Sequence, residues 1–275
     1  MSWGSFDISD STYDSKNKDT SSEITGDEQG VFFKPDGTKM YILNNNGSNV
    51  FQYSLSTAWD VSTASYDSKT KSFFYTDTDT KGMFFKPDGT KIYIAGNSQS
   101  KVFQHSLSTA WDISTASSSS EKSFSTSDSN STGIFFKPDG TKMYVCGYAT
   151  DKVYQYDLST AWDVSSASLI GNISISSKTD QVQDVFFNDS GTKMYVMDDV
   201  KKYIYQYSLS TAWSITTATY DNDSYYFNTT AGAARGFYFR IDNGTKLYIF
   251  SSELHKVFQY TTYTPTTFIP RTIMF

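Results

Sequence analysis

The 275-residue chain carries a net charge of -6, and only 19% of its residues are charged. No run of Lys or Arg exceeds two residues, which disfavours a nucleic-acid partner. Aromatic residues make up 17% of the chain, enough for a sizeable core, and the abundance of Ser, Thr, Asn, Asp and Tyr favours strands and turns over helices.

The few cysteines and histidines exclude two kinds of chemistry. Cys146 is the single cysteine, so no internal disulfide can form, and His105 and His255 are too few for a His-rich metal centre. We therefore expect no cofactor and no metal. The N-terminal residues show no signal-peptide pattern, and no stretch approaches the length of an apolar membrane span. Taken as a complete gene product, the chain is expected to be made in a cytoplasm and to have no membrane partner.

The first expected element is a strand over residues 10–20, an outer strand without a sheet of its own. Residues 6–9 and 13–16 (FDIS and YDSK) align without a gap on residues 59–62 and 66–69 (WDVS and YDSK). In the later copies this phrase connects a third strand with a fourth. The chain therefore begins inside a repeated unit.

A first complete unit follows over residues 30–75 and predicts four strands. Residues 30–35 and 38–43 flank a Pro-Asp-Gly turn, which predicts a hairpin because proline presets φ and glycine takes the left-handed position. Both faces of these two strands are apolar, which is typical of strands buried on both sides. Residues 50–55 alternate as a third strand, and the more polar residues 66–75 are expected to form the outer edge.

The unit then recurs along the rest of the chain. Its turn glycines lie 52, 51, 51 and 53 residues apart: Gly37, Gly89, Gly140, Gly191 and Gly244. Each unit has four antiparallel strands in about 50 residues, and its sheet must pack against another sheet on both faces. These features are typical of the blade of a β-propeller. The expected blade cores are residues 30–75, 82–126, 133–176, 184–227 and 236–262, the last completed by residues 6–20.

The two ends of the chain complement each other. Residues 256–260 (KVFQY) match residues 101–105 (KVFQH), and the repeat then stops before any tryptophan, so the last blade lacks its outer strand. The N-terminal strand supplies it. We therefore expect an all-β chain with one domain over residues 1–265, a single five-bladed β-propeller of four-stranded antiparallel blades closed by the N-terminal outer strand on the C-terminal blade.

Two phrases of the repeat resemble known families. Residues 32–42 (FFKPDGTKMYI) resemble the F-x-P-D-G-T-K-x-Y-V unit of YVTN-type, lactonase-like and TolB-like propellers, a turn-and-strand signature that brings no catalytic residue with it. Residues 52–68 (QYSLSTAWDVSTASYDS) resemble repeats in propeller-type proteins of bacteriophages and aquatic bacteria, including tail and other virion proteins. This second resemblance implies a place on a virion.

Ligand contacts are expected where the repeated frame varies. The loops before the first strand and between the second and third strands share one face around the channel mouth, and they diverge between copies. Such divergence is compatible with a binding surface and equally with drift of solvent-exposed loops. The candidate ligand-binding residues are Asn45, Asn46, Asn97, Gln99, Tyr148, Asp151, Asp198, Asp199, Arg235 and Glu253. A glycan site there would be composite, because five different loops cannot make five equal sites.

Other chemistry-bearing residues favour structural interpretations. Asp77 and Asp79 supply too few oxygens for calcium. His105 takes a position that holds tyrosine in the other blades, and Cys146 takes that of a buried apolar residue. Asp184 stands where the other blades have glycine, so one carboxylate is expected to face the channel, without the second acid that glycoside hydrolysis requires.

The repeated Trp-Asp pairs have two interpretations. An indole face beside a carboxylate suits a sugar ring, as at Trp59 and Asp60. The favoured interpretation is a turn capped by Ser56, with Trp59 packed under the blade.

The last expected element is an apolar C-terminal tail over residues 266–275. Pro265 and Pro270 forbid a regular strand there. Its large apolar residues are Phe268, Ile269, Ile273, Met274 and Phe275. We expect the tail to dock on a neighbouring subunit or on another virion protein, and folding back over the underside of the ring is the alternative.

These features together predict a non-enzymatic virion component of a bacteriophage, assembled in the host cytoplasm. Its expected role is that of an exposed structural or host-attachment protein, with cell-surface glycans as candidate ligands. One alternative is a secreted, extracellular, lectin-like binding protein of a bacterium. A lactonase-like hydrolase is disfavoured because no catalytic set is recognisable.

Overall fold

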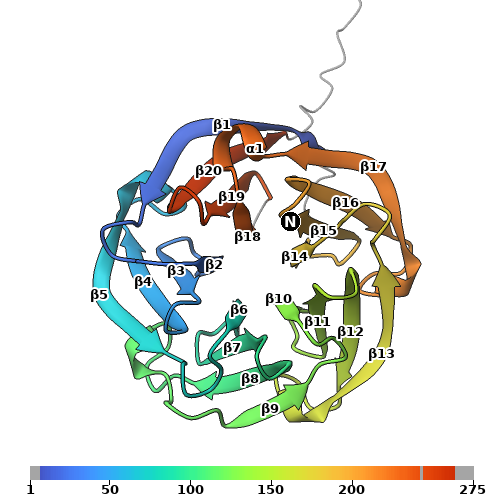
Figure 1. Cartoon of the computed structure of the whole chain (residues 1–275), viewed down its shortest axis with the longest axis horizontal. Coiled ribbons are helices and arrows are strands. Elements are labelled where there is room, and N and C mark those ends of the chain that lie inside the picture. Colours follow the sequence, from blue (N-terminus) through green and yellow to red (C-terminus); the bar gives the residue numbers. More distant parts are fainter. Residues whose placement is uncertain (1–6, 242–243, 264–275) are drawn as a thin grey trace, which may run out of the picture.

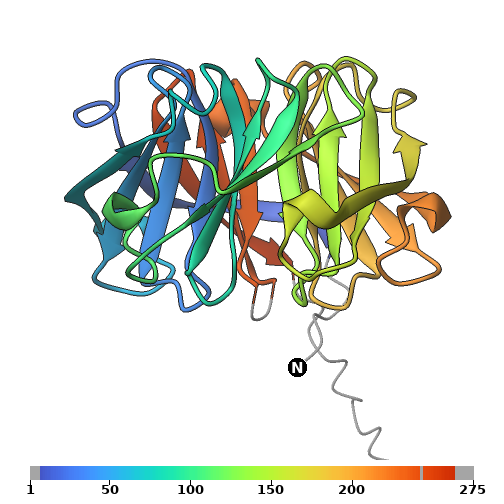
Figure 2. The ribbon, with the colours of Figure 1, turned by 90° about the horizontal axis from the view of Figure 1, so that it is seen from below.

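Five four-stranded antiparallel sheets stand around a central axis in a computed structural model that describes residues 7–241 and 244–263. Figure 1 looks down this axis, and Figure 2 shows the ring from the side. The architecture confirms the expected all-β, five-bladed β-propeller. Within the described residues, helical structure is confined to α1 (Asn228–Ala231) and four 3-10 turns, and no helix there is long and apolar enough to cross a membrane.

Each blade runs from an inner strand at the axis to an outer strand. Blade 1 has β2 (Glu28–Phe33), β3 (Lys39–Asn44), β4 (Asn49–Leu55) and β5 (Ala64–Ser72). Blade 2 has β6 (Thr80–Phe85), β7 (Lys91–Gly96), β8 (Lys101–Ser106) and β9 (Lys122–Ser125). Blade 3 has β10 (Ser131–Phe136), β11 (Lys142–Gly147), β12 (Lys152–Leu158) and β13 (Ala167–Ser174). Blade 4 has β14 (Val182–Phe187), β15 (Lys193–Asp198), β16 (Tyr203–Leu209) and β17 (Ala218–Tyr226). Blade 5 has β18 (Ala234–Phe239), β19 (Lys246–Ser251), β20 (Lys256–Tyr263) and β1 (Asp7–Asp19).

Within blade 1, the observed strand boundaries differ most from the expected ones at β2 and β5. Strand β2 begins at Glu28 rather than at residue 30, because a register shift between Glu28 and Gly30 lets the strand continue past the glycine. The outer strand β5 ends at Ser72 rather than at residue 75. Phe73 is only 1% exposed, and its carbonyl oxygen accepts the backbone N–H of Thr76 at 2.7 Å, so the chain turns inward there.

The N-terminal strand closes the ring as expected. Strand β1 pairs antiparallel with β20 along the edge of blade 5 (Figure 1). The Asp14 carboxylate accepts a hydrogen bond from Gln259 of β20 at 2.9 Å. In blade 1, where the outer strand is continuous with its own blade, Asp67 accepts one from Gln52 at 2.7 Å. The first segment of the chain therefore makes the contacts of an ordinary outer strand.

The repeated tryptophans lock each blade to the next. Trp59 is 6% exposed, and its indole covers the turn glycine Gly37, where a Cβ would lie 2.5 Å from the ring. Its carbonyl oxygen accepts the Tyr248 hydroxyl of blade 5 at 2.7 Å. The same bond recurs between blades in the pairs Tyr41–Trp111, Tyr93–Trp162 and Tyr144–Trp213. The structural interpretation of these tryptophans is confirmed.

The cap of the turn after Trp59, Trp111 and Trp162 is an aspartate, which corrects the expectation of Ser56, whereas the turn after Trp213 begins at Ser214 and has no side-chain cap. Asp60 precedes the 3-10 turn Val61–Thr63, and its Oδ1 accepts the Ser62 N–H at 3.1 Å. Its other oxygen pairs with Lys16 Nζ at 2.5 Å. An aspartate at this point satisfies a free N–H and binds a lysine from the neighbouring blade, which a serine cannot do.

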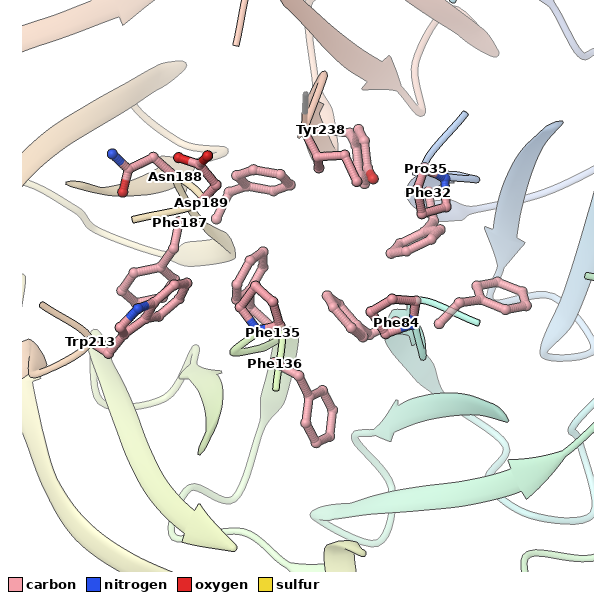
Figure 3. A pocket seen from close by; sticks show the side chains of 15 residues that line it. Phe32, Pro35, Phe84, Phe135, Phe136, Phe187, Asn188, Asp189, Trp213 and Tyr238 are labelled. Atoms are coloured by element: carbon pink, nitrogen blue, oxygen red, sulfur yellow. The ribbon is translucent and has the colours of Figure 1, made fainter. Parts of the chain in front are cut away.

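A closed ring of five aromatic side chains fills the axis, one from each inner strand. Neighbouring rings meet edge to face with centroids 5.1 to 5.4 Å apart, a favourable geometry for aromatic pairs. The members of this aromatic ring are Phe32, Phe84, Phe135, Phe186 and Tyr238, most of which Figure 3 labels. Such a cycle closes only when all blades are in place, so closure and core packing support each other.

The glycines at the start of the inner strands provide a first testable prediction. A Cβ at Gly82 would lie 2.3 Å from the backbone oxygen of Thr132 in the next blade, whereas a Cβ at Gly30 would meet no atom within 4 Å. We expect Gly82→Ala to lower the free energy of unfolding by about 1–3 kcal/mol, because the backbone must move apart. Gly30→Ala should change it by less than about 0.5 kcal/mol. Urea unfolding of both variants measures the difference, and equal effects would contradict this account.

Candidate ligand-binding site

A polar cavity lies at the end of the channel where the inner strands begin. Its volume is about 270 Å³, and all five blades contribute to its wall. We call it the polar basin, and its lining residues are Asp27, Gln29, Asp79, Lys81, Asn97, Asn130, Thr132, Tyr148, Gln183 and Arg235.

Half of the basin comes from one position of the repeat, the residue directly before the glycine position of each inner strand. In chain order these residues are Gln29, Lys81, Thr132, Gln183 and Arg235. In four blades a glycine follows, with no side chain to crowd the narrow axis, which leaves room for the polar side chains at the channel mouth; in blade 4 the next residue is Asp184. Because the five side chains differ, the ring presents an asymmetric surface on a symmetric frame.

Both cations of the basin are paired with carboxylates. Lys81 Nζ lies 2.9 Å from Asp79 Oδ1, and Arg235 lies 2.8 Å from Asp199 Oδ2. Burial alone would raise the pKa of Asp79, but the hydrogen bond from Asn97 and the ion pair with Lys81 outweigh it and hold the pKa below its ordinary value. Asp79 is therefore ionised at neutral pH. This pairing leaves the basin better suited to a neutral ligand than to a strongly charged one.

Apart from Asp79 Oδ1, which is paired with Lys81, three buried polar atoms of the basin find no hydrogen-bond partner among the described residues. They are Asn97 Oδ1, Gln183 Nε2 and the Nε atom of Arg235. A buried polar group without a partner costs free energy unless another molecule satisfies it. One acceptor and two donors beside the same cavity match hydroxyl groups, which both donate and accept.

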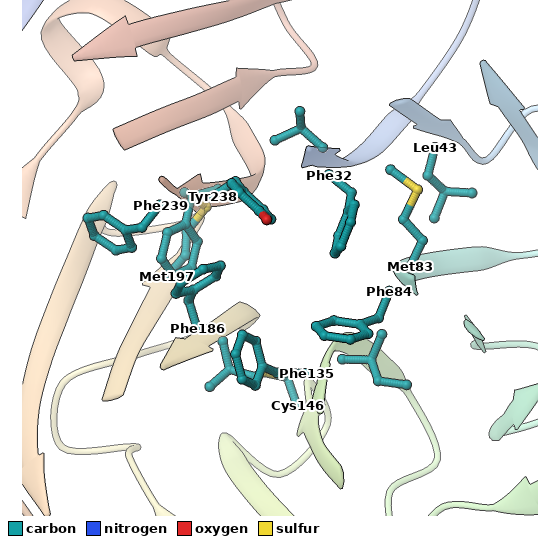
Figure 4. Packing of buried hydrophobic residues seen from close by; sticks show 14 of the residues in the cluster. Phe32, Leu43, Met83, Phe84, Phe135, Cys146, Phe186, Met197, Tyr238 and Phe239 are labelled. Carbon is teal, nitrogen blue, oxygen red and sulfur yellow. The ribbon is translucent and has the colours of Figure 1, made fainter. Parts of the chain in front are cut away.

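A single carboxylate lies one residue deeper in the channel. Asp184 Oδ1 accepts the Val185 N–H at 2.9 Å, and Oδ2 accepts the Phe237 N–H at 3.2 Å. It lines a constriction of about 20 Å³ together with apolar side chains such as Met83, several of which Figure 4 shows around the axis. Burial raises the pKa of Asp184 to about 7. The expected channel carboxylate is therefore present, and it exchanges its proton near neutral pH.

The structure brings three of the candidate residues proposed from sequence into the basin: Asn97, Tyr148 and Arg235. The other candidates form hydrogen bonds or ion pairs with other residues of the protein. Asp198 is fully buried, and its Oδ2 accepts the Asp180 N–H at 2.5 Å. Asp199 pairs with Arg235 behind the basin wall.

The remaining candidates bind backbone groups of the neighbouring loop. The carboxylates of Asp151 and Glu253 accept the N–H groups of Val182 and Ala233, at 3.2 and 3.1 Å. The side-chain amides of Gln99 and Asn46 donate to the carbonyl oxygens of Thr76 and Thr25, and the backbone N–H of Asn45 donates to that of Asp27. The tail candidates Phe268, Ile269, Ile273, Met274 and Phe275 lie outside the described residues.

Most of the basin was not among those candidates. The additional residues are Asp27, Gln29, Asp79, Lys81, Asn130, Thr132 and Gln183. A signal for the central ones was present in the sequence, because the residue before each inner-strand glycine changes from copy to copy while the strand after it repeats. That variation marks the channel mouth once the inner strands are known to converge there.

Other titratable residues have structural roles. His105 is fully buried, its Nδ1 lies 3.0 Å from the Ser117 carbonyl oxygen, and burial lowers its pKa to about 4, so the ring is neutral. Burial also raises the pKa of the Cys146 thiol far above its ordinary range, which leaves it unreactive. In the described part of the chain, no three His, Cys, Asp or Glu side chains come together as metal ligands.

Comparison with known proteins identifies the fold and no closer relationship. No protein-family model matches the sequence, and no curated protein matches it either. Among solved structures, a putative 6-phosphogluconolactonase from Bacteroides uniformis superposes with a TM-score of 0.53 at 14% identity, covering 81% of this chain and 63% of the other. A second, from Bacteroides fragilis, gives 0.55 at 10% identity, covering 81% and 76%. A functionally unknown protein from Desulfotomaculum acetoxidans gives 0.51 at 11% identity, covering 83% and 80%.

These neighbours correct the expectation of a non-enzymatic chain. Two propellers that share this fold bear the name of a lactonase, so the absence of a recognisable catalytic motif does not exclude an enzyme. The physical reason is that the repeated signature describes turns and strands, whereas reactive groups of propellers lie in the divergent positions around the channel. At these identities the likeness establishes the fold alone. The resemblance of the longer repeat phrase to phage proteins stays a prediction.

Proposed function

We propose that this protein binds a small, polyhydroxylated, sugar-like molecule in the polar basin. The observation that carries the proposal is the set of buried, unpartnered polar atoms of Asn97, Gln183 and Arg235 around a cavity of about 270 Å³. Sugar hydroxyl groups can donate a hydrogen bond to Asn97 Oδ1 and accept hydrogen bonds from Gln183 Nε2 and Arg235 Nε. The pairing of Lys81 and Arg235 with carboxylates favours a neutral ligand. Because each blade contributes different side chains to the basin wall, we expect one binding site per chain.

Hydrolysis of such a ligand is a second candidate function, and Asp184 is the observation that favours it. Its carboxyl follows Gln183 directly in the chain and lies in the channel below the basin. With a pKa near 7 it can take up a proton from water at neutral pH. A lactone ring of a sugar acid would then be the substrate class. Water would add to the carbonyl carbon while Asp184 takes its proton, the ring C–O bond would break, and the departing ring oxygen would receive that proton to give the open hydroxy acid.

Titration calorimetry with glucose, galactose, N-acetylglucosamine and gluconolactone tests the binding proposal. We expect one weak site per chain, with a Kd of roughly micromolar to millimolar. Gln183→Ala should weaken binding roughly three- to tenfold, because one hydrogen bond is lost. Asn172→Ala, which removes an exposed amide on the outer strand β13, is the matched control and should leave the Kd unchanged.

Several results would contradict the proposal. Five equal sites per chain would point to the repeated Trp-Asp pairs as the binding sites. An unchanged Kd in the Gln183→Ala variant would show that the ligand binds outside the polar basin. For the second candidate, release of acid from gluconolactone is followed at constant pH. Turnover above the spontaneous rate that Asp184→Asn abolishes would support hydrolysis, and no turnover with intact sugar binding would leave binding as the function.

A place on a phage particle remains part of the proposal, supported by the resemblance of residues 52–68 to repeats of virion proteins. In that setting weak single-site binding would serve attachment through several copies on one particle. Mass spectrometry of purified particles is the direct measurement. Detection in a bacterial secretome and in no virion would favour the secreted lectin-like alternative.

A further inference from the structure

The opposite end of the channel carries a second cavity of different chemistry. Its volume is about 260 Å³, and the aromatic ring forms its floor (Figure 3). Prolines of the repeated turns, such as Pro35 and Pro87, and Ile241 of the turn in blade 5 form its wall. Asn188 and Asp189 in blade 4 are its polar members. We call it the apolar cavity.

An open apolar cavity of this kind is costly to leave in water. Each Å² of apolar surface exposed to solvent costs about 25 cal/mol, and contiguous apolar surface on a soluble protein usually marks a contact site. The side chains of the aromatic ring already contact each other within the ring, so they cannot move together to fill the space beyond it. An occupant from outside the described residues would therefore be stabilised there.

The described chain ends at the same end of the propeller as this cavity. Strand β20 reaches Tyr263 beside the turn between β18 and β19. The Thr262 N–H donates to the Thr245 carbonyl oxygen at 3.1 Å, and the Thr262 hydroxyl donates to that of Gly244 at 2.6 Å. The same turn contributes Ile241 to the cavity wall. The residues after Tyr263 therefore start next to the cavity.

The remaining chain has the length and the composition to fill it. Twelve residues follow Tyr263, and an extended chain of that length spans roughly 40 Å. Strand β20 lies two strands outside β18, which is about 10 Å at the usual strand spacing. The segment carries large apolar side chains that match the wall: Phe268, Ile269, Ile273, Met274 and Phe275.

We propose that the C-terminal segment of the same chain, residues 266–275, docks into the apolar cavity and covers the aromatic ring from outside. Its covalent attachment next to the wall gives it a high effective concentration, which the segment of a second copy does not have. The docked segment would leave the polar basin open at the other end of the channel. This proposal takes up the alternative in which the tail folds back over the underside of the ring, and docking on a neighbouring subunit stays the competing prediction.

Deletion of residues 266–275 is the first test, read out by a dye that fluoresces in apolar sites and by thermal unfolding. We expect the deletion to raise dye fluorescence, because the cavity opens, and to lower the Tm by several degrees. A synthetic peptide of residues 266–275, added in excess, should reverse both changes. Sugar titration in the basin should be unaffected, so this test is independent of the proposed function.

Two full-length variants sharpen the test. Replacing the five large apolar residues of the segment by serine should reproduce the deletion, whereas replacing Thr266, Thr267 and Thr272 by serine should change neither readout. Equal dye fluorescence in the full chain and in the deletion variant would overturn the proposal. So would a full chain that sediments as a dimer and a deletion variant that sediments as a monomer, because a second copy would then hold the segment.

Discussion

Deletion of residues 1–19 should cost the propeller most of its stability. Strand β1 supplies the edge of blade 5, where Tyr13 packs edge-on against Phe258 at 5.7 Å between ring centroids. It also places Asp14, which accepts hydrogen bonds from Lys246 at 2.7 Å and from Gln259 at 2.9 Å. The free energy of unfolding of a domain is usually only about 5–15 kcal/mol, so the loss of a whole strand removes most of it. The deletion would also expose the backbone edge of β20, which favours aggregation.

Thermal unfolding of the truncated chain is the measurement, and a peptide of residues 1–20 supplied in trans is its complement. We expect the truncated chain to lose its cooperative transition and the peptide to restore it. A scrambled peptide of the same composition should have no effect. Full thermal stability of the truncated chain would show that closure by β1 is not what holds the ring.

Replacement of Asp184 by asparagine should make the stability of the protein less dependent on pH. Burial raises the pKa of Asp184 from its ordinary value of 3.8 to about 7. Between these values the folded carboxyl keeps a proton that the unfolded chain has lost, so the stability of the natural protein falls as the pH rises through this window. Above pH 7 the folded protein holds an ionised carboxylate in the channel. Asp184→Asn removes this cost.

Urea unfolding at pH 4.5 and at pH 8 measures the effect. We expect the stability difference between Asp184→Asn and the natural chain to grow by roughly 1–3 kcal/mol between these values, allowing for contact of the carboxyl with channel water. Asp139→Asn is the matched control. Burial alone would raise the pKa of Asp139, but the ion pair with Lys137 and the hydrogen bonds from Thr141 together outweigh it and lower the pKa to about 2, so its charge does not change in this window. The difference in unfolding free energy between Asp139→Asn and the natural chain should be the same at both pH values. If the difference for Asp184→Asn were also the same at both, the raised pKa of Asp184 would be contradicted.

Much of the fold could be predicted because its elements are local and repeated. The Pro-Asp-Gly turn at Gly37 specifies its hairpin through backbone conformations that few other residues adopt, and φ of Gly37 is indeed +73°. The match between residues 6–20 and the outer strands predicted closure, because an incomplete blade at each end leaves unpaired backbone that only the other end can satisfy. The apolar character of both faces of β2 and β3 located the core.

The two cavities follow from the ring and not from any local pattern. Gln29, Lys81 and Arg235 are about 50 to 200 residues apart in the chain, and they meet in the polar basin because five inner strands converge on one axis. The ion pair of Asp60 is likewise made with Lys16, which reaches it from the blade across the closure. Sequence patterns record the neighbours of a residue along the chain, whereas a binding site depends on its neighbours across the ring, and those are set by the number, the spacing and the closure of the blades.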